Sequence, residues 1–174
     1  MIKWFLKYID IGINKFLVKN VNNMPVRFVK MIAYYYTDAR IRKLYLSRLG
    51  LIMGEGTYGN LGLSFTMNED LSPCVIIGKN VSIAPNVTFI TNCKPNNSEI
   101  LSNNKYVKSK LIQTNGIIKI EDDVWLGTNC VIMPNITIGK GSIIGAGSVL
   151  FEDTEEFSIY AGVPAKKIRS IKNA

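Results

Sequence analysis

Residues 118–150 read IKIEDDVWLGTNCVIMPNITIGKGSIIGAGSVL, and in this stretch an aliphatic residue recurs at every sixth position. The aliphatic series consists of Ile120, Leu126, Ile132, Ile138, Ile144 and Leu150. A small or β-branched residue stands two positions before each member: Ile118, Val124, Cys130, Ile136, Ser142 and Ser148. An α-helix repeats every 3.6 residues and a strand every 2, so neither element produces this period by itself.

A solenoid with one short strand per six residues explains the period, because three such strands complete one triangular coil. The aliphatic side chain of each hexad then points inward and stacks on its equivalent in the next coil. Glycine follows the aliphatic residue at Gly127, Gly139 and Gly145, where we expect the chain to turn a corner. The stretch therefore predicts a mainly β fold, a parallel β-helix.

The same register extends toward the N-terminus, through Met53, Gly59, Phe65, Leu71, Ile77, Ile83 and Phe89. It is interrupted once, because Ile120 lies 31 residues after Phe89 and the residues between are polar and rich in Asn and Lys. We predict a β-helix domain at 49–174, an excursion loop at about 90–118 and a C-terminal helical tail at 157–174. Long loops on a rigid scaffold often carry function.

The positive charge lies in the first fifty residues, which hold ten Lys or Arg and two Asp, whereas residues 51–174 hold eleven of each sign. Aromatic residues are mixed with these basic ones at helical spacing, which predicts a helical segment at 1–48 broken near Pro25. The aromatic face packs on the rest of the chain in one interpretation, which we favour, and lies on an anionic membrane surface in the other. We expect no nucleic-acid partner, because no binding motif accompanies the basic residues.

Several features indicate a protein of the cytoplasm, with the inner membrane face as the one alternative place. The N-terminus lacks a cleavable signal pattern, and no apolar run reaches the length of a membrane span. The three cysteines, Cys74, Cys93 and Cys130, are odd in number and show no Cys-x-x-Cys spacing, which fits a reducing compartment.

The stretch 124–150, followed by YAGVPAKKIR at 160–169, resembles the hexapeptide-repeat acyltransferases, in particular the branch of sugar and antibiotic O-acetyltransferases. The resemblance covers residues 51–174. It implies a left-handed β-helix, a homotrimer with active sites between neighbouring subunits, and acetyl-CoA as the acyl donor. It also implies an acceptor-holding role for Asn60 in GTYGNLGL.

The resemblance further implies a cofactor-binding surface. Trp125 would lie beside the cofactor, although a contact in the subunit interface is an alternative for this residue. The pantetheine arm would run past Gly127, Thr128 and Ala146, and the phosphates would approach the basic residues of the tail, Lys166, Lys167 and Arg169. Clustered cations favour a phosphate-bearing ligand, but the same residues could form a solvated chain end.

The general base of the family is a histidine in a Thr-x-x-His-Pro setting at the start of the excursion. Here residues 91–95 read TNCKP, and the chain contains no histidine. We assign the catalytic position to Lys94, either as a neutral base, for which its pKa would have to fall from about 10.4 to about 7, or as a charged group that stabilises an oxyanion or holds an acidic acceptor. Cys93 and Glu99 are weaker candidates. Without histidine, a zinc site of the related carbonic anhydrases is excluded, and we expect no metal.

A second departure is the pair Phe151 and Glu152, where relatives commonly carry Thr-Lys, so a carboxylate would face the cofactor phosphates. Two functions remain open at this stage. The first is acetyl-CoA-dependent transfer to a hydroxyl of a saccharide used in cell-surface polysaccharide biosynthesis. The second is a trimeric scaffold or regulatory relative with impaired or lost catalysis.

Overall fold

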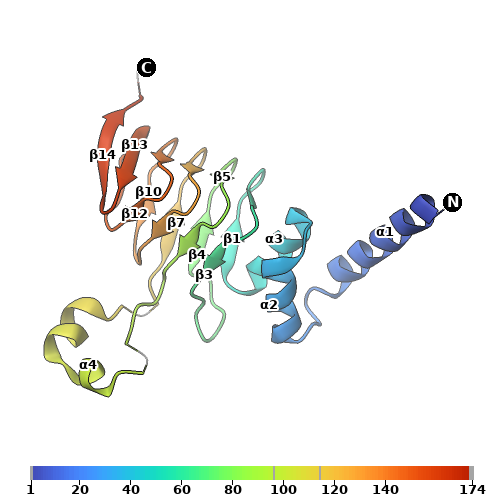
Figure 1. Cartoon of the computed structure of the whole chain (residues 1–174), viewed down its shortest axis with the longest axis horizontal. Helices are drawn as coiled ribbons and strands as arrows, with labels where there is room; N and C mark the ends of the chain where they lie inside the picture. Colours follow the sequence, from blue (N-terminus) through green and yellow to red (C-terminus); the bar gives the residue numbers. More distant parts are fainter. Residues whose placement is uncertain (1, 96, 114, 173–174) are drawn as a thin grey trace.

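The computed structural model describes residues 2–95, 97–113 and 115–172. Positions 1, 96, 114, 173 and 174, which fall in the predicted N-terminal segment, excursion and tail, lie outside the described residues, as do the side chains of residues 2–7. Figure 1 shows helices at the N-terminal end, a stack of short strands in the middle and a pair of longer strands at the C-terminal end.

The stack is a parallel β-helix, and each turn of the chain adds one strand to each of three sheets. The first sheet contains β1 (Leu51–Met53), β4 (Val75–Ile77), β7 (Ile118–Ile120) and β10 (Thr137–Ile138). The second contains β2 (Tyr58–Gly59), β5 (Ser82–Ile83), β8 (Trp125–Leu126) and β11 (Ile143–Ile144). The third contains β3 (Ser64–Phe65), β6 (Thr88–Phe89), β9 (Val131–Ile132) and β12 (Val149–Leu150).

The predicted aliphatic series from Ile120 to Leu150 forms the interior of these coils, since every member is buried. The register repeats from coil to coil, so that Met53 pairs with Ile77 and Ile77 with Ile120. The smaller residues two positions earlier are buried as well, Ser142 and Ser148 included. The six-residue period is thus the period of one strand and one corner, and burial of its aliphatic face holds the fold together.

The corners carry the strained backbone, but at a different position from the predicted one. Left-handed φ angles recur three residues before the inward aliphatic residue, at Asn80, Asn86, Asp123, Asn129, Asn135, Gly56, Gly62, Gly141 and Gly147. Gly127 and Gly139 follow the aliphatic residue instead, and they allow neighbouring coils to approach. A Cβ at Gly127 would lie 2.6 Å from the Ala146 nitrogen, and one at Gly139 would lie 2.7 Å from the Glu156 nitrogen.

Leu71 is not a coil position, so this part of the predicted register is wrong. The first coil leaves the third sheet after Phe65 and returns at Val75, and residues 66–74 form a loop in which Leu71 is half-buried with φ 58°. Glu69 occupies the place where every other hexad has a small or apolar buried residue, and a carboxylate cannot enter the core without a partner. The extra six residues therefore bulge outward, and we name residues 66–74 the first-coil loop.

Three helices precede the coils: α1 (Ile2–Asn20), α2 (Val26–Tyr35) and α3 (Ala39–Arg48). Helix α3 covers the open end of the first coil with Tyr45, Leu46 and Leu49, which are all buried. The Arg42 guanidinium donates to the Gly59 oxygen at 2.6 Å and to the Tyr36 oxygen at 2.6 Å, which ties α3 to the coil. Helix α1 extends away from the coils (Figure 1).

The predicted helical tail is wrong. Residues 157–172 contain β13 (Ser158–Gly162) and β14 (Ala165–Ser170), an antiparallel pair in which β13 extends the second sheet by pairing with β11. The composition AKKIRS favours a helix in isolation, but the edge of β11 offers backbone partners that a helix would leave unpaired. The pair covers the last coil, just as α3 covers the first.

The predicted excursion leaves after β6 and returns to β7. It contains the short helix α4 (Glu99–Asn103) and a π-helical turn, η1 (Val107–Leu111), and it stands away from the coils (Figure 1). Its two ends meet where the backbones of Cys93 and Gln113 exchange hydrogen bonds of 2.8 and 2.9 Å. This bridge places Lys94 at the base of the excursion.

Candidate active site

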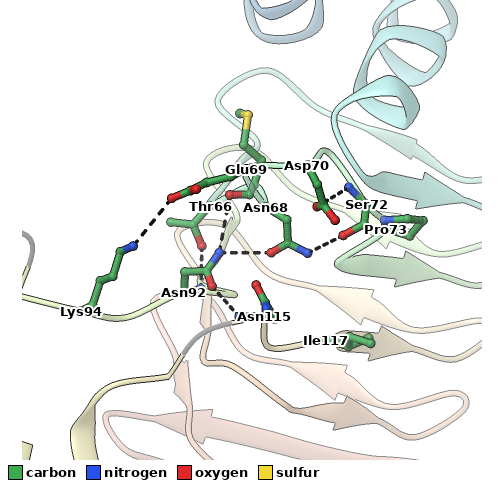
Figure 2. A pocket seen from close by; sticks show the side chains of 11 residues that line it. Thr66, Asn68, Glu69, Asp70, Ser72, Pro73, Asn92, Lys94, Asn115 and Ile117 are labelled. Atoms are coloured by element: carbon green, nitrogen blue, oxygen red, sulfur yellow. Dashed lines mark hydrogen bonds and ion pairs between the residues drawn. The ribbon is translucent and has the colours of Figure 1, made fainter. Parts of the chain in front are cut away.

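A cavity of about 700 Å³ lies between the first-coil loop and the base of the excursion. It is lined mainly by polar residues: Thr66, Met67, Asn68, Glu69, Asp70, Ser72, Pro73, Asn92, Lys94, Asn115 and Ile117. Figure 2 shows Lys94 on one side of this cavity, with Glu69 and Asp70 on the first-coil loop opposite. Two breaks in the six-residue period therefore form one site.

The floor of the cavity is a network of amide and hydroxyl side chains (Figure 2). Asn92 donates through Nδ2 to Asn68 Oδ1 at 3.2 Å, and Asn68 donates through Nδ2 to Ser72 Oγ at 2.9 Å. Thr66 Oγ1 accepts from the backbone nitrogens of Thr91 and Asn92 at 2.7 and 3.0 Å. These bonds hold the first-coil loop against the start of the excursion. The charged side chains of Glu69, Asp70 and Lys94 are therefore attached to a fixed backbone.

Lys94 Nζ lies 3.9 Å from Glu69 Oε1, and among the described residues no other partner of the Glu69 carboxylate is found. Asp70 differs, because its Oδ1 accepts from the Ser72 backbone nitrogen at 3.0 Å, and this hydrogen bond lowers the pKa of Asp70 below its usual value. A carboxylate with a lowered pKa is a weaker base. Of the two carboxylates, Glu69 is the one without a backbone hydrogen bond in the part of the chain that the structure describes.

The cysteines divide by exposure. Cys74 and Cys130 are buried, and burial raises the pKa of both thiols, which keeps them protonated and unreactive. Cys93 is exposed at the bridge that closes the excursion, and it is absent from the lining of the cavity.

Asn60 and Trp125 share a second, shallower depression of about 480 Å³ on the second sheet. Trp125 is 55% exposed. Asn60 donates through Nδ2 to the Ile83 oxygen at 2.8 Å, which orients its amide and leaves Oδ1 as an available acceptor. Tyr58 and Pro85 complete the same depression.

The predicted pantetheine surface lies at the corner between the second and third sheets. The Gly127 nitrogen donates to the Ile144 oxygen at 2.8 Å, and the Thr128 oxygen accepts from the Gly147 nitrogen at 2.8 Å. The Thr128 hydroxyl donates to the Pro85 oxygen at 2.9 Å, and Ala146 is exposed beside Gly127. The small residues at this corner allow the two coils to lie close together.

The basic residues of the tail lie on β14, and two of them are paired with the acidic residues that follow β12. Lys167 Nζ lies 2.6 Å from Glu155 Oε2, and Lys166 Nζ lies 3.7 Å from Glu152 Oε1. Arg169 is exposed on the same strand. The carboxylates expected to repel a phosphate therefore neutralise the two lysines, so a phosphate would compete with Glu152 and Glu155 for them.

One chain does not bring all the predicted site residues together. Asn60 and Trp125 share one depression, while Lys94 lines the other, which opens where the third sheet returns to the first. Sequence reasoning missed Asn68, Glu69 and Asp70. A charged residue at the buried position of the hexad ending at Leu71 was the signal that could have revealed the first-coil loop.

The coil geometry and the sequence lead to the same family. The model for bacterial hexapeptide transferases, described as six repeats, matches residues 117–152. Galactoside O-acetyltransferase of Escherichia coli K12 is 37% identical over 121 residues, which cover 70% of this chain and 54% of that protein. The chain carries the hexapeptide repeats of bacterial transferases. Residues 91–95 of this hexapeptide-repeat protein contain no histidine.

Other hexapeptide-repeat relatives agree. Galactoside O-acetyltransferase of Lactococcus lactis is 31% identical over 121 residues, covering 70% of this chain and 53% of that protein. A hexapeptide-repeat acetyltransferase from Vibrio cholerae, solved in complex with acetyl coenzyme A, superposes with a TM-score of 0.65 at 24% identity and covers 85% of this chain and 86% of that one. The fold is the left-handed β-helix of this family. The chain spans about half the length of the two galactoside acetyltransferases.

Proposed function

We propose that this hexapeptide-repeat protein transfers an acetyl group from acetyl-CoA to a hydroxyl of a saccharide. The observation that carries the proposal is the polar cavity of about 700 Å³ that faces Lys94 and Glu69, because a sugar hydroxyl needs amide and carboxylate partners. The names of the two galactoside O-acetyltransferases and the acetyl coenzyme A in the Vibrio cholerae structure support the reaction and the donor.

In this proposal Glu69 takes the proton and Lys94 carries the counter-charge. The acceptor oxygen attacks the thioester carbonyl, its proton passes to the Glu69 carboxylate, and the C–O bond forms. The C–S bond then breaks, and coenzyme A leaves as a thiolate that recovers a proton. Lys94 is half exposed and lies 3.9 Å from the Glu69 carboxylate, and we assign it to the oxyanion rather than to proton removal.

We propose that the donor lies along the second sheet. We propose that Trp125, Gly127, Thr128 and Ala146 border the pantetheine arm and that Lys166, Lys167 and Arg169 meet the phosphates. Asn60 shares the depression of Trp125 and would orient the acceptor through Oδ1. Since these residues and Lys94 lie at separate places on one prism, we propose a homotrimer in which the surface of one chain faces the cavity of the next.

The test is calorimetric titration with acetyl-CoA, followed by measurement of free coenzyme A thiol in the presence of a panel of mono- and disaccharides. We expect binding and acceptor-dependent thiol release. The comparisons give no support to the alternative of a non-catalytic scaffold. Absence of binding at millimolar acetyl-CoA would nevertheless favour that alternative over the transferase. Sedimentation of the full-length chain would test the trimer separately.

A further inference from the structure

Helices α1 and α2 expose a continuous group of apolar side chains at the N-terminal end of the β-helix. A groove of about 520 Å³ lies between the two helices, and Ile13, Phe16, Phe28 and Met31 are among its lining residues. Phe16 is 58% exposed, Phe28 54% and Met31 53%. We name Ile13, Phe16, Phe28 and Met31 the apolar groove.

Hydrogen bonds to helix α1 hold the groove in place. Tyr45 donates through its hydroxyl to the Leu17 oxygen at 2.8 Å, and Tyr36 donates to Asn14 Oδ1 at 2.6 Å. Leu17 and Ile32, which also line the groove, are buried. The exposed aromatic residues are therefore fixed outward by the packing of their neighbours, and not by a lack of packing in the segment.

Basic side chains lie on the same two helices as the apolar groove, and two of them, Lys19 and Arg27, are one helical turn from Phe16 and Met31. Lys15 and Lys19 on α1 and Arg27 and Lys30 on α2 are all exposed. Lys19 lies roughly 60° from Phe16 around the helix at 100° per residue. Only Asp10 and Asp38 oppose this charge in the first fifty residues, and Asp38 is paired with Arg40 at 2.9 Å.

The combination fits a membrane surface better than it fits other partners. Aromatic side chains enter the boundary between headgroups and acyl chains, while lysine and arginine reach the anionic headgroups beside them. A nucleic acid would pair with the basic residues but would leave Phe16, Phe28 and Met31 in water. Within the described residues, no helix is both long enough and apolar enough to cross a bilayer.

We propose that the apolar groove, with the neighbouring Lys19 and Arg27, docks the protein on an anionic lipid bilayer. The proposal does not depend on the acetyltransferase activity. In the proposed trimer, the threefold axis would run parallel to the long axis of the β-helix. Rotation about that axis leaves the direction of the β-helix unchanged, so the three grooves would lie at the same end of the trimer. Three simultaneous contacts would strengthen docking without any new contact within a chain.

The test is co-sedimentation of the full-length protein with vesicles of phosphatidylcholine alone and of phosphatidylcholine mixed with phosphatidylglycerol. We expect binding to the mixed vesicles that weakens as salt is raised. Arg27→Glu and Lys19→Glu should each weaken binding by about fivefold or more, and Phe28→Ser by about tenfold or more. Lys110→Glu on the excursion and Phe151→Ser, which is also 54% exposed but lies beyond the last coil, should leave binding unchanged.

Equal binding to the two kinds of vesicle would overturn the proposal, as would variants at Phe28 and Arg27 that bind like the parent. Size-exclusion chromatography of the same variants supplies the alternative. The parent protein could fail to bind either kind of vesicle while Phe28→Ser changes the oligomeric state. That result would assign the groove to contact with a second copy of the chain.

Discussion

Lys94 and Glu69 lie 3.9 Å apart, Nζ to Oε1, across the space between the excursion and the first-coil loop. The two residues are 25 positions apart in the chain, and each belongs to a segment that interrupts the six-residue period. Both are well exposed, so their mutual attraction contributes little to stability. Their value lies in placing one positive and one negative group over the same polar cavity.

The first prediction separates the roles of these two residues. Glu69→Gln keeps the shape of the side chain but removes the proton acceptor, and we expect kcat to fall by about 10²-fold or more. Lys94→Met removes the positive charge and should lower kcat by a similar factor through loss of oxyanion stabilisation. Thiol release from acetyl-CoA, measured with the best acceptor of the sugar panel, gives both values.

The matched control is Asp70→Asn, which lines the same cavity but is engaged with Ser72. We expect it to change KM more than kcat. Lys94→His tests whether the histidine of the family pattern can act at this position, and a gain in kcat with a new pH dependence near neutrality would support that geometry. If Glu69→Gln and Lys94→Met both retain full kcat, neither residue takes part in the chemistry.

The second prediction concerns the ion pairs on β14. Because Glu155 holds Lys167 at 2.6 Å, Glu155→Gln should free the lysine and tighten coenzyme A binding by about two- to fivefold at low salt. Lys167→Ala should weaken binding by a similar factor. Calorimetry with coenzyme A and with pantetheine, which carries no phosphate, tests whether the phosphates are responsible. The change in affinity should appear with coenzyme A alone. An unchanged affinity in both variants would place the phosphates elsewhere.

The sequence predicts the coils well, because the hexad expresses a repeated physical requirement. Ile132 and Ile138 must be buried and Gly127 must admit the next coil, so the same residue types return every six positions. The hairpin was not predictable in the same way, because β14 depends on the exposed edge of β13 rather than on its own preference. Local composition carries no information about such a tertiary partner.

The candidate site was predicted in part. Lys94 followed from the TNCKP segment, but its partner Glu69 is brought near by a loop that the register of Leu71 concealed. The neutralisation of Lys166 and Lys167 was also missed, because Glu152 and Glu155 precede them by 14 and 12 positions and meet them through the hairpin. Contacts between two segments that both interrupt the six-residue period leave no periodic pattern in the sequence from which they could be predicted.

The third prediction distinguishes the two kinds of glycine in the coils. Gly147 has φ +69° and nothing within 4 Å of an added Cβ, so Gly147→Ala should cost about 1 kcal/mol through backbone strain alone. Gly147→Asn should cost less, since Asn129 holds the equivalent corner one coil earlier with φ 57°. Gly127→Ala should cost more, toward about 3 kcal/mol, because the Cβ meets the backbone of Ala146. Urea unfolding at one protein concentration measures all three, and equal losses would contradict this assignment.

The last prediction concerns Asp38, which precedes α3 and accepts from the Arg40 backbone nitrogen at 2.8 Å. Its hydrogen bond with the Arg40 side chain is the main reason that the pKa of Asp38 is lowered to about 2. Because the folded value is below the unfolded value of about 3.9, the stabilisation is complete above that pH and is lost as pH falls toward 2.

Asp38→Ala should cost about 1 kcal/mol at neutral pH, and Asp38→Asn less, because asparagine still caps the helix. The difference between the parent and Asp38→Ala in urea unfolding should stay constant from about pH 7 to 5 and shrink below about pH 4. A difference that grows on acidification would show that the charge of Asp38 does not stabilise α3.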